Sequence, residues 1–298
     1  VANEKVEGST PFARSIKCKS MIIWIASYPK SGNTYIRSFL SSYYYSKKGK
    51  FNFEHLLNIK QFPALRYKTK KAYTFLDAAN NWIPNQNFFF KKDEYYFLKT
   101  HNTLEEYFGN KFTTSSETIG AIYIVRDPRN VISSMCNHYS LNLETAYTKM
   151  TDSNSSLSFK NTDGDYSNFT FLGSWSNHYH SWKNNINFKT LIIRYEDLRE
   201  NSYEEFKKIL KFIDGLKGQS NEINEEKLIN SINSTNFSNL KKQEKLYGFG
   251  ESSTSKNGEM INFFNLGFKN NWEKLLPKEM SKKITDKFNN ELKELKYE

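Results

Sequence analysis

Short apolar runs interrupt an otherwise polar chain at four places, and each run ends at a polar or basic residue. The runs cover residues 22–26, 95–98, 120–125 and 190–193. Their length and their content of isoleucine and aromatic residues are typical of buried strands. The first run is followed, over 35–40, by apolar residues at helical spacing. This alternation of strands and helices predicts an α/β protein.

The chain is long enough for one large domain with a substantial core. It has 298 residues, of which 38% are hydrophobic. We expect residues 21–298 to form a single domain. Residues 1–20 are polar and show no periodicity, so we expect an N-terminal tail or a cloning remnant there.

Charge and cysteine content narrow the function classes. The formal net charge of +11 suits a polyanionic ligand, nucleic acid or a membrane surface. The lysine and arginine runs are too short for a nucleic-acid arm, and no run approaches the roughly 20 apolar residues of a membrane span. We therefore predict no nucleic acid and no membrane as partner. Two cysteines, Cys18 and Cys136, lack the spacing of a metal site, and reduced thiols predict a cytoplasmic protein.

The first predicted strand leads into a loop suited to binding an anion. Between this strand and the following helix, the chain reads Pro29-Lys30-Ser31-Gly32-Asn33-Thr34. Successive backbone N–H groups and the positive end of the helix can enclose a phosphate there. The P-loop of nucleotide-triphosphate-binding proteins has a similar length, but its lysine would fall at Asn33 rather than at Lys30. The shifted lysine weakens the interpretation as a kinase or ATPase.

The next two predicted strands also end at residues suited to chemistry. The second ends at Lys99-Thr100-His101, and the third at Arg126, with Ser134 two turns into the following helix. Ligands of open α/β sheets bind at the carboxyl ends of strands, so these residues can share a crevice with the anion loop. An arginine there can donate two hydrogen bonds to one phosphate.

Together these motifs resemble those of the sulfotransferases that use 3′-phosphoadenylyl sulfate (PAPS). The match consists of the Pro-Lys-Ser-Gly-Asn-Thr loop, Lys-Thr-His at 99–101, Arg126 with Ser134, and Arg-Tyr-Glu-Asp-Leu at 194–198. The resemblance implies a three-layer fold like that of P-loop nucleoside triphosphatases, with a central, mostly parallel sheet of about five strands flanked by helices. It also implies transfer of a sulfuryl group from PAPS to a hydroxyl or amine, release of 3′-phosphoadenosine 5′-phosphate (PAP), and no metal.

The resemblance assigns roles residue by residue. His101 would be the general base, Lys30 would stabilise charge on the departing phosphate, and Lys99 and Ser134 complete the expected catalytic set. The residues expected at the 5′-phosphate are Lys30, Ser31, Gly32, Asn33 and Thr34. Arg126 and Ser134 would bind the 3′-phosphate. The remaining expected contacts to PAPS are Tyr195 and Gly267, and, at the adenine, Tyr35, Thr235 and Phe237.

Two positions depart from the family pattern. Tyr35 stands where a tryptophan usually contacts the adenine, and a tyrosine can still stack there. Near the end of the chain, Asn265-Leu266-Gly267 replaces the usual Arg-Lys-Gly, so one expected 3′-phosphate contact is missing. Lys269 is a candidate to replace that contact.

The acceptor is expected to be a small molecule with a hydroxyl or amine and an apolar part. The aromatic-rich region 51–90 and a polar loop over 142–170 would shape its site. His178 and His180 lie two residues apart in a predicted helix, so they project from different sides and form no metal pair. Two other function classes stay open: a phosphotransferase that uses ATP and magnesium, and a non-catalytic basic module that binds nucleic acid.

Overall fold

A five-stranded parallel sheet forms the centre of the protein. The computed structural model describes residues 21–91, 93–158, 163–255 and 257–298, and the predicted N-terminal tail lies outside them. The sheet has the order β2-β3-β1-β4-β7, and every neighbouring pair is parallel. Its strands are β1 (Met21–Ser27), β2 (Lys60–Gln61), β3 (Tyr95–Thr100), β4 (Thr118–Val125) and β7 (Lys189–Arg194).

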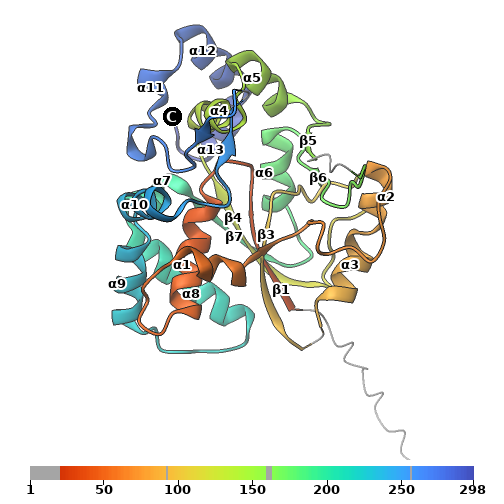
Figure 1. The fold of residues 1–298 in the computed structure, drawn as a ribbon, viewed down its shortest axis with the longest axis vertical. Helices are drawn as coiled ribbons and strands as arrows, with labels where there is room; N and C mark the ends of the chain where they lie inside the picture. Colours follow the sequence, from red (N-terminus) through yellow and green to blue (C-terminus); the bar gives the residue numbers. More distant parts are fainter. Residues whose placement is uncertain (1–20, 92, 159–162, 256) are drawn as a thin grey trace, which may run out of the picture.

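Helices cover both faces of the sheet, so the protein has three layers (Figure 1). Side chains of β1 alternate between two cores: Ile23 and Ile25 pack in one, and Trp24 and Ala26 in the other. The first core includes side chains of α1 (Asn33–Tyr45), α8 (Ser202–Leu216) and α9 (Glu225–Ser234). The second includes those of α3 (Trp82–Phe89), α4 (Pro128–Tyr139), α6 (Trp175–Lys183), α12 (Lys278–Lys287) and α13 (Asn289–Glu294). The predicted fold class is confirmed.

Burial on both faces explains why the strands were visible as continuous apolar runs. Ile22, Ile23, Trp24 and Ile25 are all fully buried. A strand that faces solvent on one side would alternate apolar and polar residues, but a strand of a covered parallel sheet has no solvent side. The pattern of the first strand is therefore a direct consequence of its central place in the sheet.

Shorter elements lie in the connections between the strands and around one end of the sheet. In the first two thirds of the chain these are η1 (Phe53–Asn58), α2 (Phe75–Asn80), α5 (Leu143–Thr151) and a two-stranded sheet of β5 (Ser156–Leu157) and β6 (Thr170–Phe171). The later ones are α7 (Tyr195–Glu200), α10 (Phe237–Tyr247), a sheet of β8 (Ser253–Thr254) and β9 (Met260–Ile261), η2 (Gly267–Lys269) and α11 (Trp272–Leu275).

The polar loop predicted over 142–170 is wrong in part, because its first section forms α5. The Asn142 side chain accepts a hydrogen bond from the Thr145 backbone N–H (2.8 Å) and caps this helix. Ala146 and Met150, four residues apart, are buried and give the helix a packed face. Residues 159–162 of the predicted loop lie outside the described part of the chain.

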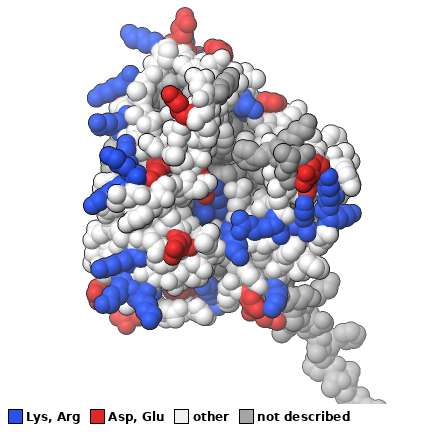
Figure 2. Space-filling model, viewed as in Figure 1, with Lys and Arg blue, Asp and Glu red and all other residues white. Residues whose placement is uncertain are grey.

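The positive charge of the protein is distributed over several parts of its surface. Figure 2 shows lysine and arginine side chains in separate groups, with acidic side chains among them. Some of these charges are paired, as in the surface salt bridge between Lys283 and Glu144 (2.7 Å), and such exposed pairs contribute little to stability. None of the helices in the described ranges is long and apolar enough to cross a membrane.

Candidate active site

The carboxyl ends of β1, β3 and β4 open into one cavity of about 890 Å³. This is the edge of a parallel sheet at which open α/β folds bind their ligands. Most of the predicted site residues line the cavity: Lys30, Gly32, Asn33, Thr34, Tyr35, Lys99, His101, Arg126, Ser134, Tyr195, Phe237 and Gly267. The structure therefore brings together segments that lie far apart in the sequence.

Two predicted contacts, Ser31 and Thr235, are not among the residues that line the cavity. Both side chains are fully buried. The Thr235 hydroxyl donates a hydrogen bond to the Ser231 carbonyl (2.7 Å) in α9. The hydroxyl proton is therefore used within this helix end, and the contact of Thr235 with the adenine stays a prediction. Phe237, two residues later, does line the cavity.

Gly32 determines the shape of the anion loop. Its φ is +104°, and a Cβ at this position would lie 2.4 Å from Tyr195 Cδ2, so only glycine fits beneath the tyrosine ring. The Asn33 side chain donates to the Ile25 carbonyl (2.9 Å) and holds the loop against β1. Within the described ranges, no side chain caps the start of α1. The first backbone N–H groups of this helix are therefore available to an anion.

His101 follows β3 and is held in one tautomer. Its Nδ1 lies 2.7 Å from the Ser27 carbonyl oxygen, which can only accept, so Nδ1 carries the proton and Nε2 has the lone pair. Burial lowers the pKa of the His101 imidazole well below 6.5, and the charge of Lys99 lowers it further. His101 is thus a neutral base at neutral pH, which is the state that a general base requires.

Two lysines bring positive charge to the same end of the cavity. Burial lowers the pKa of Lys30 to about 7; the carboxylate of Glu251 opposes this shift, whereas Lys99 adds to it. Burial also lowers the pKa of Lys99, and Glu251 again opposes the shift. Lys30 Nζ lies 3.7 Å from the centroid of the Phe263 ring, whose face attracts a cation. Negative charge that develops here would meet two positioned cations.

Arg126 contacts the anion loop and, together with Ser134, provides a second set of hydrogen-bond donors in the cavity. Its Nη1 donates to the Lys30 carbonyl (3.2 Å), and its guanidinium carbon lies 4.4 Å from the centroid of the Tyr195 ring. The Arg126 Nε is buried and has no hydrogen-bond partner within the described part of the chain. Ser134, on α4, lines the same cavity. This pair can bind a phosphate distinct from one held in the loop.

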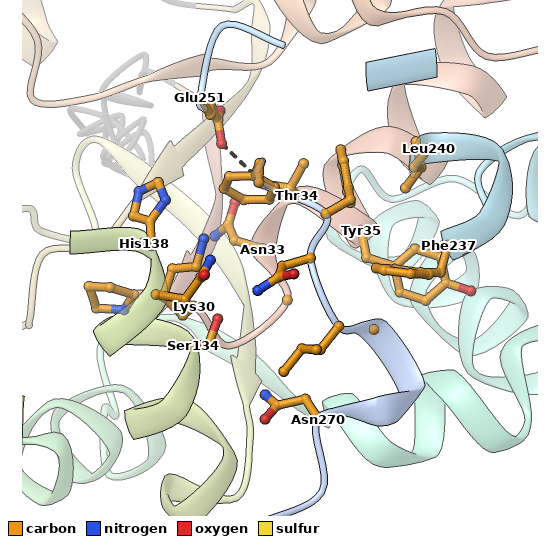
Figure 3. A pocket seen from close by; sticks show the side chains of 18 of the residues that line it. Lys30, Asn33, Thr34, Tyr35, Ser134, His138, Phe237, Leu240, Glu251 and Asn270 are labelled. Carbon is orange, nitrogen blue, oxygen red and sulfur yellow. Dashed lines mark hydrogen bonds between the residues drawn. The ribbon is translucent and has the colours of Figure 1, made fainter. Parts of the chain in front are cut away.

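Aromatic side chains line another part of the cavity. Figure 3 shows Tyr35 and Phe237 on the opposite side of the view from Lys30. The Tyr35 ring meets the Phe206 ring edge-on, with the two centroids 5.3 Å apart, so its position is fixed by packing. Gly267 lies directly against Phe237, because a Cβ on Gly267 would lie 2.4 Å from Phe237 Cε1. Flat, positioned aromatic faces of this kind suit a purine base.

The two histidines of α6 have separate structural roles. The His178 ring lies behind His101, with Nε2 at 3.0 Å from the His101 carbonyl and Nδ1 at 2.9 Å from the Tyr123 hydroxyl. His180 instead pairs with Glu291, at 3.1 Å. Across the described ranges, no cluster of histidine, cysteine, aspartate and glutamate is placed to hold a metal ion.

The cavity includes residues that the sequence motifs did not indicate: Arg199, Glu251 and Asn270. Lys269, the candidate for the missing family arginine, is exposed and is not among the lining residues. Glu251 lies in a loop with no recognisable motif. The sequence gives a clue only through its salt-bridge partner, Arg37. Arg37 falls among the apolar residues of a predicted helix, and a buried arginine requires an acceptor.

Comparison with known families agrees with this geometry. The family model described as "Sulfotransferase domain" matches residues 21–296, which is nearly the whole chain. The chain belongs to the sulfotransferase family. The predicted family is therefore confirmed, and with it the reaction class, sulfuryl transfer from PAPS, and the cofactor.

Solved structures share the fold of this sulfotransferase at low sequence identity. Mouse sulfotransferase SULT7A1, complexed with PAP, is 16% identical with a TM-score of 0.50, and the match covers 93% of this chain and 84% of that one. Retinol dehydratase is 18% identical with a TM-score of 0.56, in one complex with androsterone and the inactive cofactor PAP and in another with retinol and PAP. Each of these two matches covers 92% of this chain and 81% of that one. No curated protein sequence matches the chain significantly.

Proposed function

We propose that this sulfotransferase transfers the sulfuryl group of PAPS to a hydroxyl or amine of a small acceptor, with His101 as the general base. One observation carries the assignment of the base. His101 lines both the cavity of about 890 Å³ and a second cavity of about 560 Å³, and Gln61 and Leu157 also line both. A base at the junction of two cavities can reach an acceptor in one and the reacting group in the other.

The first cavity has the features that PAPS requires. The anion loop and the uncapped start of α1 would hold the 5′-phosphate, and Arg126 with Ser134 would hold the 3′-phosphate. Tyr35 and Phe237 offer aromatic faces to the adenine. When bound, PAPS supplies an activated sulfuryl group on a phosphate that leaves readily.

The chain itself supplies a base and fixed positive charge. The acceptor proton is assigned to His101 Nε2, because the Ser27 carbonyl holds Nδ1 in its protonated form. Lys30 and Lys99 would stabilise the negative charge that grows on the departing phosphate and on the sulfuryl oxygens. Ser134, from α4, would orient the same end of the nucleotide that Arg126 binds.

The second cavity is the proposed acceptor site. Its apolar lining includes Pro63, Leu65 and Leu157, and its polar lining includes Gln61, Arg66 and Thr170. These residues come from the 51–90 and 142–170 regions, both of which were predicted to shape the acceptor site. The complexes of retinol dehydratase with androsterone and with retinol support a small-molecule acceptor. We propose a compound with one apolar part and one hydroxyl or amine near His101.

We also propose that residues 21–298 form one domain of a cytoplasmic protein. The family match over 21–296 supports the single domain. Within the described residues Cys136 forms no disulfide, and a chain with only two cysteines has no disulfide framework of the kind that secreted proteins use. Cys18 lies outside the described residues.

Calorimetry without metal, with PAP, 5′-AMP and ATP as ligands, tests the assignment of the nucleotide site. We expect PAP to bind at least about tenfold more tightly than 5′-AMP, because only PAP has a 3′-phosphate for Arg126. Arg126→Ala should weaken PAP binding by about 10- to 100-fold and leave 5′-AMP binding nearly unchanged, as expected for a lost hydrogen-bonded charge. Equal losses for both nucleotides would contradict the 3′-phosphate role.

The pH dependence of kcat/KM for PAPS is expected to be bell-shaped. The free enzyme needs a protonated Lys30 and a neutral His101. Because the pKa of Lys30 is lowered to about 7, kcat/KM should fall as pH rises through about 7. Because the pKa of His101 is lowered, its charged form appears only well below pH 6.5, and the acid limb should lie there. Initial rates with one saturating acceptor over this range provide the measurement; an acid limb above pH 6.5 would argue against His101.

A further inference from the structure

Glu251 places a carboxylate inside the basic end of the cavity. It lies in the loop between α10 and β8, and Figure 3 shows its side chain directed at Thr34 of the anion loop. The Thr34 hydroxyl donates to Glu251 Oε2 (3.1 Å), and Lys99 Nζ lies 3.2 Å from the same oxygen. Arg37 Nη1 donates to the other oxygen, Oε1 (2.5 Å). One carboxylate thus links the anion loop, α1 and the end of β3.

The two cations that Glu251 binds are deeply buried. The side chains of Arg37 and Lys99 are only 5% and 8% exposed. The salt bridges of the described residues give neither of them a second carboxylate. A buried cation without a partner is strongly unfavourable, so the contacts with Glu251 offset the cost of burying both groups in these positions.

Glu251 also belongs to a segment that supplies part of the cavity lining, here called the closing segment (residues 248–255 and 257–264). This segment carries Phe263, the ring that lies against Lys30 Nζ. Its other attachment is Glu244 of α10, whose carboxylate accepts hydrogen bonds from the backbone N–H groups of Phe263 (2.6 Å) and Phe264 (2.9 Å). The closing segment is therefore fixed to α10 by one carboxylate and to the anion loop by the other.

We propose that Glu251 is a positioning residue for the transfer: its carboxylate fixes Lys99 beside the anion loop and anchors the closing segment across the reacting end of the cavity. The proposal rests on the proposed function, since it takes Lys99 and the anion loop as the groups that meet the phosphosulfate. Glu251 acts through these groups and is assigned no bond to the reacting atoms.

The negative charge of Glu251 also affects the protonation of the two lysines. It raises the pKa of both Lys30 and Lys99 against the effect of burial, so a larger share of each lysine stays protonated at neutral pH. Arg37 acts in the opposite direction on Lys99. The charged or titratable groups that face Lys30 come from five other parts of the fold: Glu251, Lys99, Arg126, Glu244 and His138.

Two substitutions with opposite expected effects test the proposal. Glu251→Gln keeps the shape and removes the charge, so the basic limb of kcat/KM for PAPS should move to lower pH by about one unit, with a loss of about fivefold at pH 7 that rises to about tenfold at higher pH. Arg37→Gln removes one of the two cations that compensate the Glu251 carboxylate, so more of its negative charge acts on Lys30 and the same limb should move to higher pH. Glu259→Gln, an exposed change of equal charge on the same segment, should leave the profile unchanged.

For each variant, PAP calorimetry and thermal unfolding are measured together with the pH profile of kcat/KM. A basic limb that moves to lower pH in Glu251→Gln and to higher pH in Arg37→Gln supports the proposal. If Glu251→Gln does not fold, Arg37→Gln alone still tests it. An unchanged limb in a folded, PAP-binding Glu251→Gln variant overturns it. Tighter PAP binding in that variant, with kcat unchanged, also overturns it and makes the carboxylate a competitor of the cofactor. Failure of the unsubstituted protein to bind PAP would instead overturn the proposed nucleotide site, and this inference with it.

Discussion

Replacement of His101 by alanine is expected to lower kcat by about 10²- to 10⁴-fold, the usual contribution of a general base. The loss should fall on turnover, because His101 lines the junction of the two cavities and is not among the residues assigned to phosphate or adenine. PAP should therefore bind the variant within a few-fold of its normal affinity. Initial rates with saturating PAPS and calorimetry with PAP measure the two quantities separately.

His180→Ala is the matched control for this substitution. His180 lies on α6, pairs with Glu291 and is not among the lining residues of either cavity. It should retain nearly normal kcat. Normal turnover of His101→Ala would reject the assignment of the base, and a parallel loss of PAP binding would show that the substitution had altered the nucleotide site.

Replacement of Lys30 by methionine should lower kcat by about 10²- to 10³-fold, the effect of removing one donor that stabilises transition-state charge. Methionine keeps the length and the contact with the Phe263 ring but has no positive charge. PAP binding should weaken less than kcat falls, since the charge of Lys30 is assigned mainly to the growing charge of the departing phosphate. Single-turnover rates with pre-bound PAPS report the chemical step directly.

Lys269→Met provides the comparison, because this lysine is exposed and does not line the cavity. Its kcat should remain near that of the unsubstituted protein. If Lys30→Met and Lys269→Met lost activity to a similar degree, general charge rather than the placement of Lys30 would account for the effect. The basic limb of the pH profile should also disappear in Lys30→Met, since the group that titrates near pH 7 is gone.

The parts of the site that could be predicted from the sequence are those in which geometry is local. Lys30, Gly32 and Thr34 lie on one strand–loop–helix unit, where the spacing alone places the loop at the carboxyl end of a strand. Arg126 and Ser134 are likewise held on one strand–helix unit. The parallel sheet could be predicted for the same reason, because strands buried on both faces appear as apolar runs.

Long-range contacts and very short elements could not be predicted. Nothing around Glu251 marks it as the partner of Arg37, since the pairing depends on how the chain folds over more than two hundred residues. The edge strand β2 has two residues, too few for a periodic pattern. For Thr235 the motif could be recognised, but the hydrogen bond of its hydroxyl within the end of its own helix could not be predicted.

The lining of the main cavity extends from Pro29 to Asn270, almost the full length of the described chain. During synthesis on the ribosome, the anion loop emerges more than two hundred residues before the segment that carries Glu251 and Phe263. The cofactor therefore cannot assist the early stages of folding, because its site does not yet exist. Once both segments have folded together, bound nucleotide favours only the assembled site, so we expect PAPS and PAP to protect the protein against unfolding and proteolysis.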